Sequence, residues 1–243
     1  MFKYRKVLYR NYYSEHSARV RMDGIRKGFE QQVRYFSREI IPHLTEDKNA
    51  KILDLGCGTG SMLGALKSNG YTNILGIDIS EDQIRVAAEM GITETVHGDI
   101  LEHLKNAENQ YDIITGIDIV EHFSKDELVD LLQKVKSALS ENGMAIFRTP
   151  NMDSPMSSVY AHADFTHECF LNMSSAIQLM QAVGFKKVKV SPGLVFIENP
   201  LKELFRKVIW GVQKVCLKLT LFATGRTWHE VVFEPNIVIQ VSK

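Results

Sequence analysis

The chain has 243 residues, of which 44% are hydrophobic and 24% are charged. This is the composition of an ordinary soluble globular chain, and the length fits one α/β domain with additions, or at most two small domains. Basic and acidic residues both number 29, so no overall charge indicates nucleic acid as a partner.

The N-terminal part of the chain, residues 1–44, is expected to form a helical cover. Residues 1–23 are rich in Arg and Tyr and only weakly helical in pattern. A helix is expected over residues 24–41, and Pro42 ends it. Its apolar residues recur every three or four positions and share one face. They are Ile25, Phe29, Val33, Phe36 and Ile40.

Three closely spaced glycines organise the rest of the chain. The apolar run 51–55 predicts a buried strand, the glycines follow it directly, and a helix is expected over 61–69. Bare glycine backbone lets a ligand approach the main chain, as in the nucleotide-binding corner of a doubly wound sheet. The spacing does not match the dinucleotide pattern Gly-x-Gly-x-x-Gly, and no Gly-Lys-Ser/Thr follows. The glycines are Gly56, Gly58 and Gly60.

Alternating strand and helix patterns continue to the C-terminus and predict an α/β fold. Further strands are expected at 73–79, 93–97, 111–116, 143–149, 185–190 and 236–241, and helices at 81–90, 125–139 and 173–183. Ser124 and Glu127 form a capping box for the second of these helices, and Gly184 ends the third. Residues 150–172 show no periodicity. Acidic residues stand at the ends of the first three strands, namely Asp54, Asp78 and Asp99.

The run Asp54-x-Gly56-x-Gly58-x-Gly60 resembles motif I of the class I S-adenosylmethionine-dependent methyltransferases. The resemblance implies a Rossmann-like three-layer sandwich with a seven-stranded sheet, in which strands 185–190 and 236–241 form an antiparallel edge pair. It implies a methyltransferase domain over residues 45–243, with a helical insertion at 191–230. The N-terminal helix would then be a lid over cofactor and substrate, a sheet cover, or both.

The same resemblance implies the cofactor, S-adenosylmethionine, and its product S-adenosylhomocysteine. Asp54 and the glycines would hold the methionine end, Asp78 the ribose hydroxyls and Asp99 the adenine amine. Helix capping by Asp78 and a plain turn at Asp99 are the structural alternatives. The full expected cofactor set is Asp54, Gly56, Cys57, Gly58, Gly60, Asp78, Ile79, Gln83, Gly98, Asp99, Ile100, Ile117, Asp118 and His122.

Two segments are candidates for the acceptor site. Residues 117–123 contain Glu121-His122 and are similar to the small-molecule branch of the family, where this pair follows the fourth strand. The loop 160–171 carries two histidines and two acids within seven positions. Histidine is the natural base near neutral pH, and a carboxylate beside it can orient the ring. We expect His167 as base with Asp164 as partner. His162 and His122 are rivals, and a purely structural polar loop is the alternative.

A metal is an alternative at the same place. Asp118-x-x-Glu121-His122 resembles an acidic-acidic-histidine signature of some quinone-biosynthesis O-methyltransferases that carry a divalent ion. Asp164 or His167 could add a ligand for Mg²⁺ or Zn²⁺. Asp118 stands where a glutamate would be expected, so no metal ligand is assigned.

The expected reaction is methyl transfer to an oxygen of a small molecule. The Glu-His segment and the histidine loop look like bacterial methyltransferases that modify sugars in polysaccharide or lipid-linked glycan pathways. The alternative acceptor is a quinone or lipid-like phenol, and a second alternative is a non-catalytic cofactor-binding scaffold. No Asn-Pro-Pro-Tyr-like motif follows the fourth strand, which disfavours methylation of nucleobase amines.

Residues 200–223 predict a basic amphipathic helix that the core fold does not require. Such a helix packs on its own domain or on a second copy, or lies in a membrane interface. The apolar face comprises Leu201, Leu204, Phe205, Val208, Ile209, Val212, Val215, Leu219 and Phe222. Residues 225–229 form a polar, aromatic turn that could border a pocket. The sequence does not decide between a monomer and a homodimer.

Cysteine usage and hydropathy indicate the compartment. The three cysteines are far apart and odd in number, which suggests neither a disulfide framework nor a zinc site and fits a reducing cytoplasm. They are Cys57, Cys169 and Cys216. The first thirteen residues lack the apolar run of a signal peptide, and no uncharged stretch approaches the ~18 apolar residues of a membrane span. We expect a cytoplasmic protein, with contact at the inner membrane face if residues 200–223 bind lipid.

Overall fold

A computed structural model describes residues 5, 8, 22–227 and 231–243 of the chain. Most of the N-terminal segment 1–23 that was expected to be weakly helical lies outside the described residues. So do Trp228 and His229 of the turn that was expected after residue 224.

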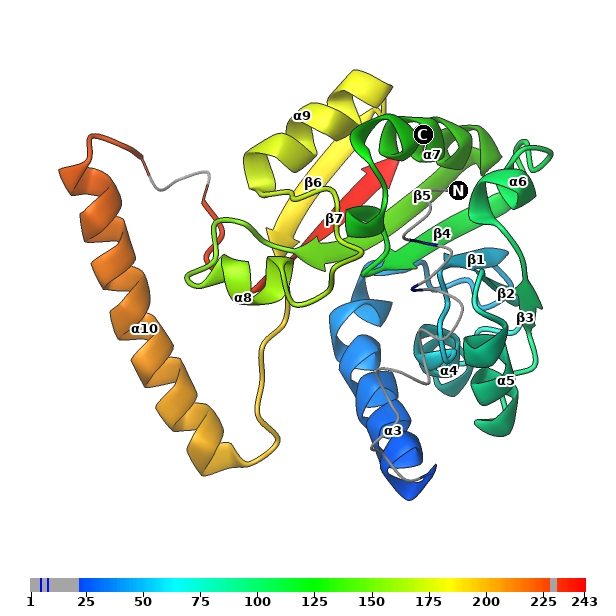
Figure 1. Cartoon of the computed structure of the whole chain (residues 1–243), viewed down its shortest axis with the longest axis horizontal. Helices are drawn as coiled ribbons and strands as arrows, with labels where there is room; N and C mark the ends of the chain where they lie inside the picture. Colours follow the sequence, from blue (N-terminus) through cyan, green and yellow to red (C-terminus); the bar gives the residue numbers. More distant parts are fainter. Residues whose placement is uncertain (1–4, 6–7, 9–21, 228–230) are drawn as a thin grey trace.

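A seven-stranded sheet forms the centre of the molecule (Figure 1). Its strand order is β3-β2-β1-β4-β5-β7-β6, with β7 antiparallel to both of its neighbours and the other pairs parallel. This confirms the predicted Rossmann-like sheet and its antiparallel edge pair. The strands are β1 (Ile52–Leu55), β2 (Ile74–Asp78), β3 (Thr95–His97), β4 (Tyr111–Ile117), β5 (Leu139–Pro150), β6 (Lys187–Pro192) and β7 (Asn236–Ser242).

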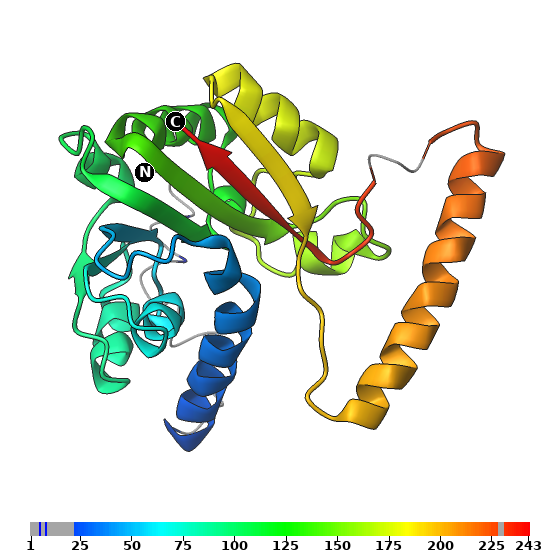
Figure 2. The same cartoon turned by 180° about the vertical axis from the view of Figure 1, so that it is seen from behind.

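Helices cover both faces of this sheet and bury it on both sides (Figures 1 and 2). On one side lie α3 (Met22–Glu39), α4 (Ser61–Ser68) and α5 (Glu81–Glu89), and on the other α6 (Ile100–Leu104), α7 (Lys125–Ala138) and α9 (Met173–Val183). Successive strand residues point to opposite faces, so Ile113 packs under α4 while Ile114 packs under α7. Because both faces are buried, the strands read as continuous apolar runs.

Local signals located the long helices accurately. The predicted Ser124–Glu127 capping box begins α7, and Gly184, with a φ of 90°, ends α9. Two short helices, α6 and α8 (Ser157–Ala161), were not predicted. Each has only five residues, which is too short for an apolar period to show in the sequence.

The N-terminal helix α3 packs directly on α4. Gly64 of α4 makes this approach possible, since a Cβ there would lie 2.8 Å from Cγ2 of Val33 and 2.9 Å from Cζ of Phe29. Phe36 and Ile40 are buried in the same core. A short 3₁₀ helix, η2 (Ile41–His43), follows and contains Pro42. The expected cover therefore exists over the described part of residues 1–44.

The insertion between β6 and β7 forms the helix predicted for residues 200–223. This helix, α10 (Pro200–Ala223), is capped by the Asn199 side chain, which accepts from the Lys202 amide at 3.1 Å. It stands apart from the sheet in both views (Figures 1 and 2). None of its residues is buried among the described residues, so the alternative in which its apolar face packs on its own domain does not hold. No helix in the described part of the chain is long and apolar enough to cross a membrane.

The α3–α4 contact can be tested with two glycine substitutions. We expect Gly64→Ala to lower the free energy of unfolding by about 1–3 kcal/mol, because the new methyl group overpacks against Val33 and Phe29. Gly28→Ala in α3 is the matched control. It has no atom within 4 Å of its Cβ position, so it should raise stability by up to about 1 kcal/mol. Urea unfolding measures both, and equal stabilisation by the two variants would contradict the close packing.

Candidate active site

The turn between β1 and α4 needs glycine for both conformation and space. Gly56, Gly58 and Gly60 have φ values of 66°, 54° and 80°, in the left-handed region that other residues rarely adopt. A Cβ at Gly56 would lie 2.6 Å from Cδ1 of Ile119, and one at Gly58 would lie 2.9 Å from Oε1 of Gln83. Any larger residue here would displace the walls of the neighbouring cavities.

Two cavities flank this turn and share three wall residues, Gly56, Gln83 and Asp118. The larger, of about 450 Å³, lies between the turn and α3. The smaller, of about 300 Å³, lies over the ends of β2 and β3 and the start of α7. Both therefore lie beyond the carboxyl ends of the parallel strands, where ligands bind in open α/β sheets.

The expected cofactor residues distribute over these two cavities. Asp54, Gly56, Cys57, Gly58, Gln83, Ile117 and Asp118 line the larger one. Gly56, Asp78, Ile79, Gln83, Asp99, Ile100, Asp118 and His122 line the smaller one. Gly60 and Gly98 are not among the described wall residues of either cavity. Gly60 instead abuts Ile92, and the Gly98 amide donates to the carbonyl of Asp78 at 2.9 Å.

The lid role that was expected for the N-terminal helix also has a structural basis. Phe29, Gln32 and Phe36 of α3 line the larger cavity, and the Ser61 hydroxyl donates to Oε1 of Gln32 at 2.7 Å. The same helix thus covers the sheet and closes one side of the cavity.

Asp54 is a buried carboxylate at the floor of the larger cavity. Its Oδ1 accepts from the Thr115 hydroxyl at 2.7 Å. Burial raises the pKa of Asp54 to about 7, and the Thr115 hydrogen bond offsets part of that shift. No Lys or Arg among the described residues pairs with it. A cationic ligand in the cavity would supply the missing counter-charge.

Asp78 and Asp99 hold backbone groups as well as lining the smaller cavity. Asp78 accepts from the amides of Gly58 and Ser80, both at 2.8 Å, so it fixes the glycine turn to the end of β2. Ser80 caps α5, because its side chain accepts from the Gln83 amide. Oδ1 of Asp99 caps α6 by accepting from the Leu101 amide at 2.8 Å. Helix capping, the alternative considered for Asp78, is thus the observed role of Asp99 in place of the plain turn considered for it, and its place in the cavity wall is compatible with a ligand contact as well.

S-adenosylmethionine fits these residues. Asp54 is a buried carboxylate without a cationic partner among the described residues, and the cofactor carries a sulfonium and an ammonium group. Gly56 and Gly58 leave space that a Cβ would fill beside the same cavity. Asp54 would hold the cationic end, and Asp78 and Asp99 line a second cavity suited to a nucleoside.

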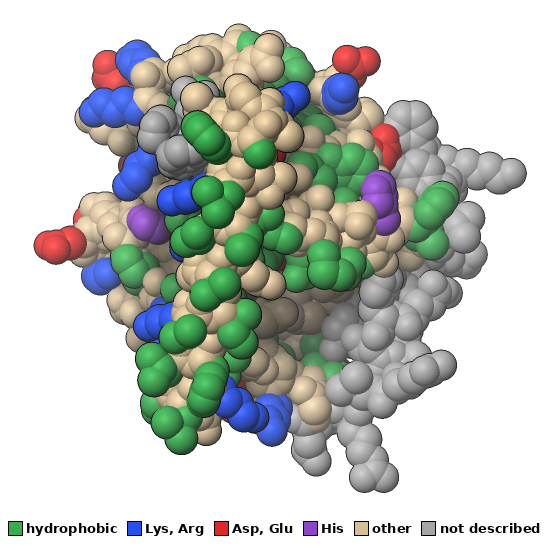
Figure 3. Space-filling view, turned by 90° about the vertical axis from the view of Figure 1, so that its left-hand side faces the viewer, with side chains coloured by type: hydrophobic (Ala, Val, Ile, Leu, Met, Phe, Trp, Pro, Cys, Tyr) green, Lys and Arg blue, Asp and Glu red, His purple; other side chains and the backbone are tan. Residues whose placement is uncertain are grey.

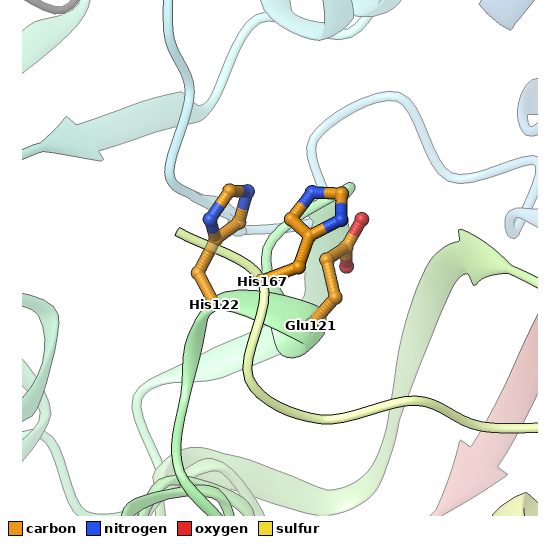
Figure 4. Close-up of side chains that lie close together, drawn as sticks. All are labelled: Glu121, His122 and His167. Atoms are coloured by element: carbon orange, nitrogen blue, oxygen red, sulfur yellow. The ribbon is translucent and has the colours of Figure 1, made fainter. Parts of the chain in front are cut away.

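Two histidine rings meet beside the smaller cavity (Figure 4). His122 comes from η3 (Val120–His122) and His167 from the loop between α8 and α9. Their ring centroids are 4.7 Å apart at an interplanar angle of 75°. Burial and the adjacent His167 lower the pKa of His122 to about 4, so its ring is neutral at pH 7.

Hydrogen bonds assign the tautomer of both rings. The Thr166 hydroxyl donates to Oδ1 of Asp164 at 2.7 Å, so Nδ1 of His122 donates to Thr166 Oγ1, also at 2.7 Å. His167 Nδ1 lies 2.9 Å from the carbonyl of Ala161, which can only accept. Nδ1 therefore carries a proton in both residues, and the lone pair of the neutral His122 ring is on Nε2.

The structure groups the histidine-loop residues differently from the pair that the sequence suggested. Asp164 connects to His122 through Thr166, a relay that the sequence did not predict. His122 lines the smaller cavity, whereas His167 packs behind it. His162 is exposed and stacks edge-on against Phe170, with 5.2 Å between ring centroids. Among the four candidates His122 is therefore the best placed base.

Glu121 lies next to the two histidines, and the three side chains could hold a metal ion. Their ligand atoms lie within 4.8 Å of one another. Glu121 accepts from the Thr149 hydroxyl at 3.0 Å, and burial, with Asp118 nearby, raises its pKa to about 8. Of the ligands considered from the sequence, Asp118 is instead paired with Arg148, and Asp164 accepts from Thr166.

Two arginines that the sequence did not single out hold the site together. Arg148, at the end of β5, joins Asp118 of the cavity wall to Glu39 of α3, whose carboxylate lies 3.1 Å away. Arg5 lines the smaller cavity, donates to both carboxylate oxygens of Glu127 at 2.8–2.9 Å, and donates to the carbonyl of His122 at 2.7 Å. No local motif marks either residue, because these partners are 30 to 122 positions away in the sequence.

A family model described as a methyltransferase domain matches residues 29–190, two thirds of the chain. The chain belongs to this family. Together with the sheet topology and the relatives below, this makes it a class I S-adenosylmethionine-dependent methyltransferase. The match covers α3 from residue 29 onward, most of the wall residues of both cavities, and the histidine loop.

Curated relatives of this methyltransferase are distant. The ubiquinone biosynthesis O-methyltransferase of Hydrogenovibrio crunogenus is 27% identical over 184 residues, which cover 69% of this chain and 74% of the relative. The tRNA U34 carboxymethyltransferase of Pseudoalteromonas translucida is 25% identical over 62% of this chain. The methyltransferase spans about half the length of that relative and of several others.

Solved structures share the fold at low sequence identity. An S-adenosylmethionine-dependent methyltransferase from Archaeoglobus fulgidus superposes with a TM-score of 0.66 at 22% identity, covering 88% of this chain and 94% of the other. A Haemonchus contortus phosphoethanolamine N-methyltransferase, solved with S-adenosylhomocysteine, superposes with a TM-score of 0.59 at 16% identity, over 89% of this chain and 53% of the other.

The raised pKa of Asp54 predicts how cofactor affinity depends on pH. Ligand-free Asp54 is half protonated near pH 7, and a bound cation favours its charged form, so binding releases a proton. Affinity for S-adenosylmethionine should therefore rise by up to about tenfold per pH unit towards pH 7 and then level off. Calorimetric titration from pH 5.5 to 8 measures this.

Two variants act as controls for this pH dependence. Asp54→Asn should bind weakly at every pH and lose the rise. Thr115→Val removes the hydrogen bond that lowers the Asp54 pKa, so it should move the midpoint above pH 7. A rise that persists in Asp54→Asn would assign it to another group.

Proposed function

We propose that this methyltransferase methylates a hydroxyl oxygen on a lipid-soluble, phenol-like small molecule, with His122 as the general base. The observation that carries the proposal is the hydrogen-bonded relay of Asp164, Thr166 and His122 at the wall of the smaller cavity. A base is needed to deprotonate a hydroxyl during methyl transfer, and this relay leaves a lone pair on Nε2 of His122.

The roles of the residues follow from this geometry. S-adenosylmethionine, when bound, supplies an electrophilic methyl group on a sulfonium. The acceptor oxygen would take this methyl group and leave S-adenosylhomocysteine, and Nε2 of His122 would accept the hydroxyl proton. Thr166 and Asp164 hold the ring in the required tautomer and stabilise the imidazolium. Cys57 takes no part in the proton transfer, because burial raises the pKa of its thiol and so disfavours the reactive thiolate.

The surface around the histidine loop and the names of several relatives both favour a lipid-soluble acceptor. Apolar side chains at and within α8, which leads into this loop, are exposed, and this favours an apolar partner near the site. They are Met156 (74% exposed), Val159 (54%) and Tyr160 (44%). Several relatives at 26–28% identity are named ubiquinone biosynthesis O-methyltransferases. The sugar acceptor expected from the sequence has no such support and stays a prediction.

An acceptor panel tests the proposal. Purified protein with methyl-labelled S-adenosylmethionine is given a catechol that carries a short prenyl chain, the same catechol without the chain, or a nucleotide sugar. Preference for the prenylated catechol supports the proposal. Transfer to the nucleotide sugar alone would contradict the proposal and support a sugar acceptor instead. Cofactor binding without transfer to any fraction of a cell extract would favour the scaffold alternative.

Substitution of the relay gives a sharper test of mechanism. His122→Ala should lower kcat by about 10²–10⁴-fold while cofactor affinity changes little. Thr166→Val, which keeps the shape but removes the hydroxyl, should lower kcat, whereas Thr166→Ser should restore it. His162→Ala is the matched control, because His162 is exposed and outside both cavity walls, and its kcat should stay unchanged. Equal losses in the Ser and Val variants would show that Thr166 acts only in packing.

A metal-assisted form of the reaction is the second candidate, favoured by the grouping of Glu121, His122 and His167. A divalent ion there would lower the pKa of the acceptor hydroxyl directly. We expect turnover to survive exhaustive chelation, because burial raises the pKa of Glu121 to about 8, and its protonated carboxyl group is a poor metal ligand at neutral pH. Loss of turnover on chelation, with recovery on adding Mg²⁺ or Zn²⁺, would establish the metal-assisted form.

A further inference from the structure

The outward face of α10 is apolar along its whole length. Nine large apolar side chains on it are each between 56% and 70% exposed. They are Leu201, Leu204, Phe205, Val208, Ile209, Val212, Val215, Leu219 and Phe222. Figure 3 shows hydrophobic side chains running down this helix on the side turned away from the sheet. Contiguous exposed apolar surface of this size marks an interaction site.

The inward face of α10 carries the contacts to the protein body. Nε1 of Trp210 donates to Glu234 at 3.1 Å, and Nζ of Lys214 lies 3.2 Å from the same carboxylate oxygen. Arg206, Trp210 and Lys214 line a cavity of about 440 Å³ between the helix and the edge of the sheet. These polar contacts orient the helix so that its apolar side faces outward, the reverse of an ordinary amphipathic surface helix.

Basic residues border the apolar face. The helix contains five basic residues and one acidic residue, although the whole chain has no net charge. By helical geometry, Lys207 and Lys218 flank one side of the apolar face and Lys202 the other. The single acid, Glu203, is already paired with Arg206 and Lys207. The surface is therefore complementary to an apolar layer covered by negative charge.

We propose that α10 is a membrane-docking helix that lies in the headgroup region of an anionic lipid bilayer, with its apolar face among the acyl chains. A helix of 24 residues with this pattern lies along the interface for about 36 Å. It does not meet the requirements for crossing the bilayer. The docking is a property of α10 and does not depend on the identity of the methyl acceptor.

A second copy of the chain is a poorer occupant of this face. Two α10 helices packed through their apolar faces would bring the bordering lysines of both copies together. The one acidic residue on each helix is engaged within its own chain. Like charges would therefore border such an interface, whereas acidic lipid headgroups would neutralise the same lysines.

Vesicle binding by the full-length protein tests this proposal. Co-sedimentation is measured with vesicles of phosphatidylcholine alone and with 30% phosphatidylglycerol added. We expect strong binding to the anionic vesicles and weak binding to the neutral ones. A polarity-sensitive dye on Cys216 gives a second readout, because this cysteine lies on α10 and is exposed while Cys57 and Cys169 are buried. Its emission should shift to the blue on binding.

Variants separate the apolar and electrostatic contributions. Val208→Asp and Val212→Asp should each lower the partition coefficient by about tenfold or more. Lys207→Gln and Lys218→Gln should each lower binding to anionic vesicles by about fivefold and leave binding to neutral vesicles unchanged. Val129→Asp on α7 is the matched control, because Val129 is also exposed but lies outside α10, and it should bind like the unchanged protein. Circular dichroism verifies that each variant keeps its helices.

Three results would overturn the proposal. The first is failure of the unchanged protein to bind anionic vesicles. The second is normal vesicle binding by the Val208→Asp, Val212→Asp double variant. The third is a dimer in sedimentation equilibrium that the same double variant dissociates, without vesicle binding, which would assign the apolar face to a second copy. Loss of methyl transfer with retained vesicle binding would count against the proposed reaction only.

Discussion

A hydrogen bond from the Gly58 amide to the Asp78 carboxylate joins the turn after β1 to the end of β2, and the two cavities of the site lie on either side of it. The turn can reach Asp78 because three glycines adopt left-handed backbone conformations. The same backbone leaves room for Gln83 and Ile119 to approach. One strand-to-helix connection thus determines the shape of both cavities, and the parallel sheet brings the other strand ends to the same edge.

Burial shifts the pKa values of two groups at this edge of the sheet in opposite directions. It raises the pKa of Asp54 to about 7 and lowers the pKa of His122 to about 4. Both shifts disfavour the charged form. Asp54 therefore becomes charged at low cost only beside a cationic ligand, and the charge of a protonated His122 is stabilised by the Asp164 carboxylate. This suits a site that binds a cationic cofactor at one end and receives a proton at the other. The rigid supports are Thr115 for Asp54 and Thr166 for His122.

Local patterns were sufficient for most of the elements and for the cofactor side of the site. The run from Asp54 to Gly60 is contiguous, so its strand, its turn and its place at a strand end follow from neighbouring residues. The proton-transfer side was harder, because it combines η3 with a loop 44 positions later. From the sequence, Asp164 suggested itself as the partner of His167 by proximity along the chain. In the fold Thr166 connects it to His122, since the loop returns over the end of β4.

The amphipathic helix α10 shows which properties follow from the sequence alone and which depend on tertiary contacts. Its residue range, its apolar face and its basic border follow from helical periodicity, because 3.6 residues per turn assign each side chain to a face whatever the surroundings. Which face meets the protein depends on tertiary contacts, and those of Trp210 and Lys214 with Glu234 turn the apolar side outward.

The same division between sequence and tertiary structure holds for the whole protein. The sequence by itself determined the strands and the long helices, the methyltransferase family and the cofactor corner, since these depend on short-range patterns. Only the tertiary structure decided the relay behind His122, the arginine contacts of Asp118 and the exposure of α10, because each joins residues whose separation along the chain carries no periodic signal.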